Sequence, residues 1–100
     1  MIFFLFLGAI EAQARTPSEA RGNIVYQTHC TSCHHSEPKR NGSLGPAVAG
    51  ASEELLRARI LEGKYPEGYK PKRQTKIMVP LPTLKEEIKS LYLYLNQPSK

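Results

Sequence analysis

Both cysteines of this 100-residue chain lie in one five-residue segment, Cys30-Thr31-Ser32-Cys33-His34. Two thiols at this spacing, followed directly by an imidazole, form the pattern by which a protein attaches a haem covalently. Two thiols on one helical turn can add to the two vinyl groups along one edge of the porphyrin, and His34 then lies beneath the iron as its proximal ligand. The segment therefore predicts one covalently bound haem c, with the fold built around it.

A zinc site, a thiol redox motif and a structural disulfide are the other uses of such a cysteine pair. Zinc needs further ligands, but all three histidines lie within one turn of the cysteines, and no His, Cys or Asp follows residue 35. A redox dithiol is expected after a strand, whereas the residues before Cys30 are predicted to be helical. A disulfide between such near neighbours would constrain little of the unfolded chain. Haem attachment is therefore the favoured interpretation.

An apolar run from Met1 to Ile10 opens the chain and is too short to span a bilayer. The small residues of Ala12-Gln13-Ala14 follow it as a cleavage pattern. We therefore expect residues 1–14 to be a signal peptide cleaved after Ala14, and residues 15–100 to form one domain. No Lys or Arg precedes the apolar run, so only the amino terminus supplies the positive charge of a signal peptide. A buried helix of the mature fold is the alternative.

The domain of residues 15–100 is near the lower size limit for a self-sufficient apolar core. A haem, which is large, flat and mostly apolar, would complete that core. The chain is basic, with a formal net charge of +5, and five of its bases cluster at Lys64, Lys70, Lys72, Arg73 and Lys76. This cluster is either a solvated face or a docking patch for redox protein partners with an acidic face. No nucleic-acid-binding module is recognisable, so we expect no binding of nucleic acid, and we expect a monomer.

Three helices and no strand are predicted. The first begins at the capping box Thr16-Pro17-Ser18-Glu19 and runs to about Cys30. Gly22 within it costs about 1 kcal/mol relative to alanine, which indicates a close crossing with another helix. The second helix is capped by Ser52 and ends at Gly63.

The third helix is predicted to begin at a capping box over residues 83–86 and to end near Asn96. Its apolar residues recur at spacings of three and four: Leu84, Ile88, Leu91 and Leu95. Residues 36–50 and 64–82 are rich in glycine and proline, so both are expected to be long loops.

The face of the iron opposite His34 needs a second ligand, and Met78 is the candidate. The other two histidines belong to the same peptide segment as His34, which confines them to its side. Met78 is the sole methionine beyond the start of the chain and lies in the long loop just before the last helix. Lys72 and Lys76 are the rivals. With His and Met in both axial positions, iron has no vacancy for oxygen or substrate, so the pattern predicts one-electron transfer and not an enzyme.

Together these residues resemble class I cytochrome c, the small monohaem electron carriers of respiratory chains. The resemblance covers nearly all of residues 15–96 and rests on Gly22, Tyr26, the haem-attachment segment, Leu44-Gly45-Pro46, Met78, Leu91 and Tyr94. It implies an all-α cytochrome c fold whose first and last helices cross at these positions. It also implies that the Pro46 carbonyl orients the His34 imidazole, and that haem attachment is completed outside the cytoplasmic membrane, in the periplasm.

Two features depart from the family's usual pattern, because Val79 separates Met78 from Pro80 and a second histidine follows His34. Within residues 65–73 we expect Tyr65 or Arg73 to approach a haem propionate, since buried carboxylates need donors. Two alternative functions stay open. One is a haem-based small-ligand binder, sensor or peroxidase-like enzyme in which Met78 does not hold the iron, and the other is a dedicated electron-transfer subunit of a larger oxidoreductase.

Overall fold

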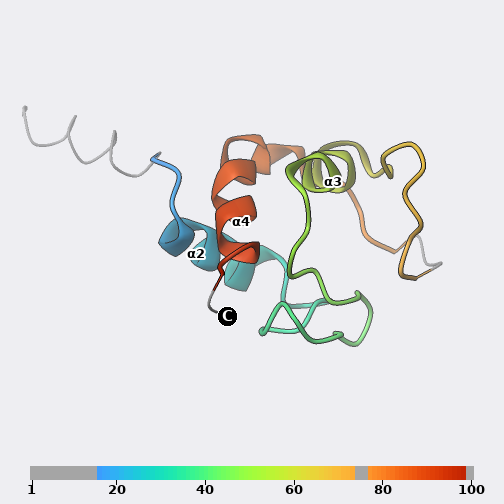
Figure 1. Cartoon of the computed structure of the whole chain (residues 1–100), viewed down its shortest axis with the longest axis horizontal. Helices are drawn as coiled ribbons and strands as arrows, with labels where there is room; N and C mark the ends of the chain where they lie inside the picture. Colours follow the sequence, from blue (N-terminus) through green and yellow to red (C-terminus); the bar gives the residue numbers. More distant parts are fainter. Residues whose placement is uncertain (1–15, 74–76, 99–100) are drawn as a thin grey trace, which may run out of the picture.

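The computed structural model describes residues 16–73 and 77–98, so the predicted signal peptide, residues 1–14, and Lys76 lie outside the described residues. Helix α2 spans Glu19–His29, and helix α3 spans Glu53–Arg57 and continues as a π-helical turn, η1, over Ala58–Glu62. A 3-10 helix, η2, Pro82–Glu87, leads into helix α4, Ile88–Leu95. The described residues contain no strand, which confirms the predicted all-α fold of three helices and long loops (Figure 1). None of their helices has the length and apolar character needed to cross a membrane.

Helix α2 begins later than the sequence pattern predicts. Its N-cap is Ser18, whose backbone is extended and whose hydroxyl accepts a hydrogen bond from the Arg21 amide at 3.0 Å. The predicted cap at Thr16 is therefore wrong. A serine bonds the amide three residues ahead when it occupies the N-cap itself, and Ser18 meets that condition. The C-terminal end is as predicted, because Cys30 caps the helix by donating its amide to the Tyr26 carbonyl.

The second helix is confirmed at both ends. The Ser52 hydroxyl accepts a hydrogen bond from the Leu55 amide at 3.0 Å, and Gly63 ends the helix with a φ of 67°, in the left-handed region that favours glycine. The sequence did not indicate the widening into a π turn at Ala58. Because the amides of Gly63 and Lys64 both donate to the Ala58 carbonyl, the carbonyls that follow in the turn are available to partners outside it.

The predicted capping box over residues 83–86 is wrong. These residues lie inside η2, which has no side-chain cap, and the α-helical part begins only at Ile88. Prolines on both sides of Leu81 restrict the backbone there, and the Leu81 amide donates to the Ile60 carbonyl at 2.6 Å. The last helix therefore starts as a tight turn fastened to η1, and its α-helical part ends at Leu95, next to Asn96, as predicted.

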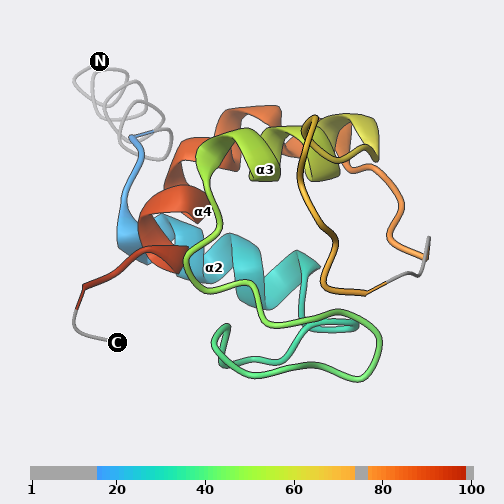
Figure 2. The same cartoon turned by 45° about the vertical axis from the view of Figure 1, so that its right-hand side comes forward.

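Helices α2 and α4 cross at Gly22, and Figure 2 shows them packed side by side. A Cβ atom at Gly22 would overlap the Ser90 carbonyl oxygen and lie 2.7 Å from the Tyr94 Cβ. The Ser18 amide donates to the Ser90 hydroxyl at 3.1 Å. The close crossing predicted from the helix glycine is therefore confirmed.

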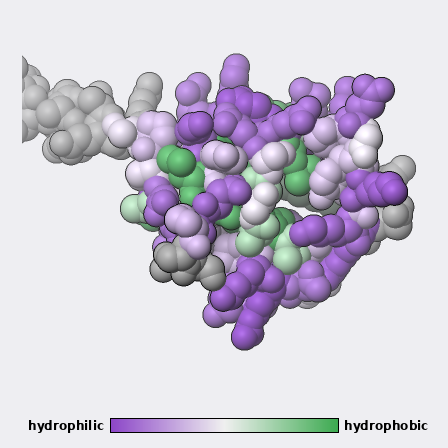
Figure 3. Space-filling view, viewed as in Figure 1, coloured by the Kyte–Doolittle hydropathy of each residue, from purple (hydrophilic) through white to green (hydrophobic). Residues whose placement is uncertain are grey.

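An ion pair closes the edge of this crossing. Nε and Nη2 of Arg21 donate to the two carboxylate oxygens of Glu87 at 3.0 and 2.8 Å. Beneath it, Tyr26, Ile88 and Leu91 are fully buried. The two helices share this core with α3 and η1, which contribute the buried side chains of Leu56 and Ile60. Hydrophilic residues cover most of the face in Figure 3, and hydrophobic residues show in the hollow near its centre.

Candidate functional site

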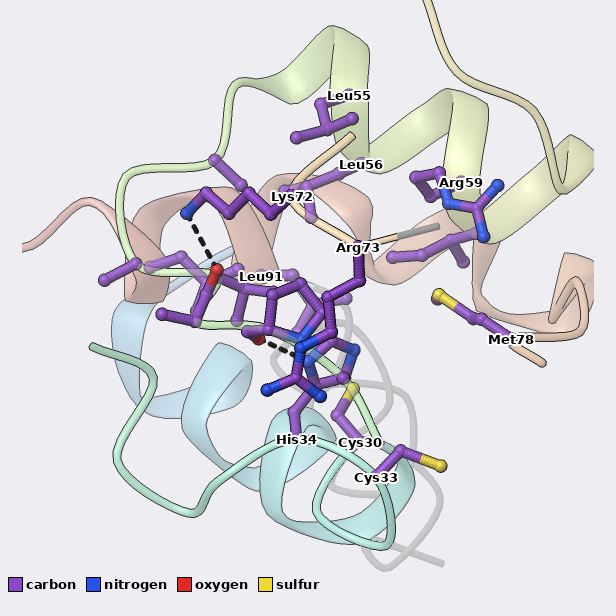
Figure 4. A pocket seen from close by; sticks show the side chains of 18 of the residues that line it. Cys30, Cys33, His34, Leu55, Leu56, Arg59, Lys72, Arg73, Met78 and Leu91 are labelled. Carbon is purple, nitrogen blue, oxygen red and sulfur yellow. Dashed lines mark hydrogen bonds between the residues drawn. The ribbon is translucent and has the colours of Figure 1, made fainter. Parts of the chain in front are cut away.

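A cavity of about 440 Å³ lies between the end of α2, the underside of α3 and η1, and α4. Its walls include apolar side chains from all three helices, among them Leu55, Leu56, Ile60, Leu91 and Leu95. All seven residues singled out from the sequence line this one cavity: Cys30, Cys33, His34, Pro46, Tyr65, Arg73 and Met78. The fold thus gathers residues from four separate segments around a single space (Figure 4).

The haem-attachment segment forms the floor of the cavity, where the side chains of Cys30 and Cys33 lie beside that of His34 (Figure 4). After the cap of α2 the chain turns once more, because the His34 and Cys33 amides donate to the Cys30 carbonyl at 2.9 and 3.3 Å. No disulfide joins the two cysteines. This extra turn places both thiols and the imidazole on the same wall.

Loop 42–47 holds the imidazole from one side. Nδ1 of His34 lies 2.8 Å from the Pro46 carbonyl oxygen. A carbonyl oxygen can only accept, so Nδ1 carries the proton, which leaves Nε2 of the neutral ring with a lone pair for a metal. Gly45 makes the approach possible, because a Cβ there would lie 2.6 Å from Nδ1. The Gly45 amide also donates to the Cys33 carbonyl at 2.9 Å, which fastens the loop to the attachment segment.

Met78 is half-buried, packs against the hydrophobic core and lines the cavity. In Figure 4 its thioether lies across the cavity space from His34 and below Arg59. Of the two predicted rival ligands, Lys72 donates its ammonium group to the Ala47 carbonyl at 2.9 Å, and Lys76 lies outside the described residues. The other two histidines are not among the lining residues.

Tyr65 and Arg73 line the same cavity at its polar side. The rings of Tyr65 and Tyr69 are stacked, with centroids 5.4 Å apart, and the Arg59 guanidinium lies 4.2 Å from the Tyr65 centroid. The sequence reasoning missed Arg59. Arg59 follows Leu56 by three residues, so the helical periodicity places it on the same face as the buried leucine. A basic residue is usually assigned to the solvent-exposed face, and this assignment hid it.

The charges around the cavity all have one sign. Three cations line it, Arg59, Lys72 and Arg73, and no carboxylate is present among the lining residues that the structure describes. Of the predicted basic cluster, Lys64, Lys70 and Lys72 are exposed. Arg73 is half-buried and donates to the Gly42 carbonyl at 3.1 Å, and Lys72 donates to Ala47 of the same loop. The cavity therefore favours a ligand that is apolar over most of its surface and acidic at its edge.

The environment of the buried thiol opposes its ionisation. Burial raises the pKa of Cys30 to about 11, so the group is a neutral thiol at pH 7. Disulfide exchange needs the thiolate, so this environment disfavours it. Within residues 16–73 and 77–98 no three His, Cys or Glu side chains gather to hold a metal ion. The cysteine pair is thus not part of an assembled zinc cage.

The residues present fit a covalently attached haem. Two thiols and an oriented imidazole share one wall, a thioether faces the same space, and the remaining walls are apolar. The cations at the edge suit two carboxylates. A small domain with a hollow of this kind needs a large apolar group to complete its core.

Comparison with known protein families gives one match, in which the family model described as Cytochrome c matches residues 19–99. Comparison with curated proteins and comparison with solved structures gave no match. The matched range begins at the first residue of α2 and includes every lining residue named above.

Proposed function

Because the chain belongs to the cytochrome c family, whose members carry covalently attached haem c and transfer electrons, we propose that it is an exported class I monohaem carrier with His34 and Met78 as the axial ligands. Haem c supplies an iron that alternates between Fe(III) and Fe(II) and so carries one electron at a time. The chain's own residues hold that group, orient it and limit the access of other ligands.

The observation that carries the proposal is the placement of an oriented imidazole beside two thiols, with Met78 lining the same cavity. Cys30 and Cys33 would hold the haem through thioether bonds, and His34 would bind the iron through Nε2. The hydrogen bond to the Pro46 carbonyl keeps the ring in one tautomer and increases its basicity. Met78 would occupy the remaining axial position, which favours the reduced state relative to a second histidine.

The polar residues of the cavity would receive the haem propionates. Tyr65 and Arg73 are the candidates from the sequence, and the absence of carboxylates among the described lining residues supports this placement. Arg73 already donates to the Gly42 carbonyl, but a guanidinium has five N–H donors and keeps others for a second acceptor.

The partners would be redox proteins that present an acidic face. Lys64 and Lys70 are exposed beside the cavity, and exposed cations raise the rate of encounter with an acidic surface, with an effect that weakens as salt rises. We further propose that residues 1–14 direct export to the periplasm and are removed after Ala14, and that the mature protein is a monomer.

The test is a pair of absorption spectra. The ferric protein is expected to show the weak far-red band of methionine-ligated haem, and the reduced protein is expected to show no shift on addition of carbon monoxide. In Met78→Ala the band should disappear and carbon monoxide should bind. Immediate binding of carbon monoxide by the wild type would overturn the proposal in favour of a small-ligand binder, sensor or peroxidase-like enzyme. Gel filtration of the native extract separates a free carrier from a subunit of a larger oxidoreductase.

A further inference from the structure

The segment that carries Met78 rests on the end of η1 through two contacts. The Leu81 amide donates to the Ile60 carbonyl at 2.6 Å, and the Pro80 ring faces the Cα of Gly63. A Cβ atom at Gly63 would lie 3.0 Å from the Pro80 Cγ and 3.5 Å from its Cδ. The first value is well inside the usual carbon contact distance of about 3.5–4.0 Å. Glycine therefore leaves space that the proline ring fills.

Both contacts depend on how this helix ends. The Ile60 carbonyl is available because the amide four residues ahead, that of Lys64, donates instead to Ala58. Gly63 takes a φ of 67° and turns the chain away from the helix axis, which leaves its Cα open to Pro80. The end of η1 thus offers the Ile60 carbonyl as an acceptor for the Leu81 amide, and the Cα of Gly63 as a contact surface for the Pro80 ring.

The distance from this contact to Met78 is short along the chain. Pro80 follows Met78 after a single residue, and the ring of proline fixes its own φ and restricts the residue before it. Because few backbone torsions between Pro80 and Met78 are free to rotate, a shift of Pro80 also shifts Met78. Val79, which separates Met78 from Pro80, is exposed, so it adds no other anchor to the core.

We propose that Gly63 and Ile60 are positioning residues for Met78: the end of η1 is a seat for Pro80 and Leu81, and this seat holds the thioether toward the cavity. The proposal rests on the assignment of Met78 as an axial ligand. It assigns a role in ligand retention to the backbone at two positions, one of which, Ile60, also lines the cavity.

The test compares two glycines with the same backbone requirement. Gly63 and Gly68 both have positive φ, 67° and 83°, but a Cβ at Gly68 has nothing within 4 Å. Gly63→Ala and Gly68→Ala therefore carry a similar left-handed backbone cost, and only the first displaces Pro80. The haem-loaded ferric proteins are titrated with imidazole, which competes with Met78 for its position, and the far-red band is recorded in parallel.

We expect Gly63→Ala to bind imidazole about tenfold more tightly than the wild type, because the apparent affinity rises with the fraction of molecules in which Met78 has left. Its far-red band should weaken. Gly68→Ala should match the wild type in both measurements. In the double variant Gly63→Ala/Pro80→Ala, which lacks the ring atoms that the new methyl meets, imidazole affinity should return to that of Pro80→Ala alone.

The two proposals fail in different ways. If the wild type binds imidazole as tightly as Met78→Ala, the ligand assignment is wrong. If the wild type resists imidazole but Gly63→Ala and Gly68→Ala behave alike, Met78 is a ligand and the seat is not what holds it. Should Gly63→Ala fail to fold, Gly63→Asn and Gly68→Asn repeat the comparison, because asparagine tolerates the left-handed region better.

Discussion

Replacement of Gly22 by alanine tests whether the close crossing of α2 and α4 holds the domain together. Helix propensity alone predicts that Gly22→Ala stabilises the protein by about 1 kcal/mol, because glycine is a poor helix former. The structure predicts the opposite sign. The new Cβ would meet the Ser90 carbonyl, and a backbone group cannot turn away as a side chain does.

The size of the loss follows from the contacts at the crossing. The Tyr94 Cβ would lie 2.7 Å from the new methyl, so the helices must separate by about 1 Å to reach ordinary carbon contact. Overpacking costs about 1–3 kcal/mol, and the upper end applies where backbone must move. Separation also weakens the hydrogen bond from Ser18 to Ser90, which is worth about 1 kcal/mol. After subtraction of the gain in helix propensity of about 1 kcal/mol, the free energy of unfolding is expected to fall by about 3 kcal/mol.

Denaturant unfolding of the haem-loaded protein measures this loss, and the corresponding decrease in Tm is about 12 to 24 °C. Asn23→Ala is the matched control, because Asn23 is the exposed neighbour in the same helix and its replacement changes propensity without entering the crossing. The control should leave the free energy of unfolding unchanged or slightly raised. A Gly22→Ala protein as stable as the wild type would refute the reasoning.

Three further predictions concern other parts of the molecule. The Arg21 guanidinium lowers the pKa of Glu87 from its usual 4.5, so the ion pair stabilises the fold above that pH, and this stabilisation is lost as the pH falls through the lower pKa of the folded state. Below about pH 4.5 the denaturation midpoint should therefore fall more steeply with pH for the wild type than for Glu87→Gln. Parallel curves for the two proteins would count against the ion pair. In Gly45→Ala the methyl would lie 2.6 Å from Nδ1 of His34, so the absorption spectrum and the haem-to-protein ratio should both change. Wild-type values for both would show that loop 42–47 moves to accommodate the methyl. Mass spectrometry of protein exported from a bacterial host should give a chain that starts at Arg15 and carries one haem; retention of residues 1–14 would contradict the predicted cleavage.

The residues at the floor of the cavity are close together because they are close in the sequence. Three of the seven predicted site residues lie within five consecutive positions, and α2 positions them by ending where the pattern indicated. Ser52 and Gly63 were also correct, since a cap acts only on the next few residues. Gly22 predicted a long-range contact, because an internal glycine is costly unless another backbone approaches it.

The sequence failed where two local solutions compete or where partners are distant. Two hydroxyl residues, Thr16 and Ser18, both precede the first helix, and only the fold decides between them. At the last helix, the Leu81 amide finds the Ile60 carbonyl across the molecule, and no local pattern reports that bond. The hydrogen bonds that Lys72 and Arg73 donate to the loop before them are of the same kind, because their acceptors are carbonyls far away in the sequence.

The crossing of the two helices also joins segments from opposite ends of the domain. The hydrogen bond between Ser18 and Ser90 spans 72 positions, and that between Gln97 and Glu19 spans 78, so these contacts can close only after the final turns have been made. The segment from Cys30 to His34, which holds both thiols and the imidazole, is made much earlier. A chain that ends before α4 would thus carry both thiols and the imidazole but lack the helix against which Gly22 packs, together with the core residues Ile88, Leu91 and Leu95.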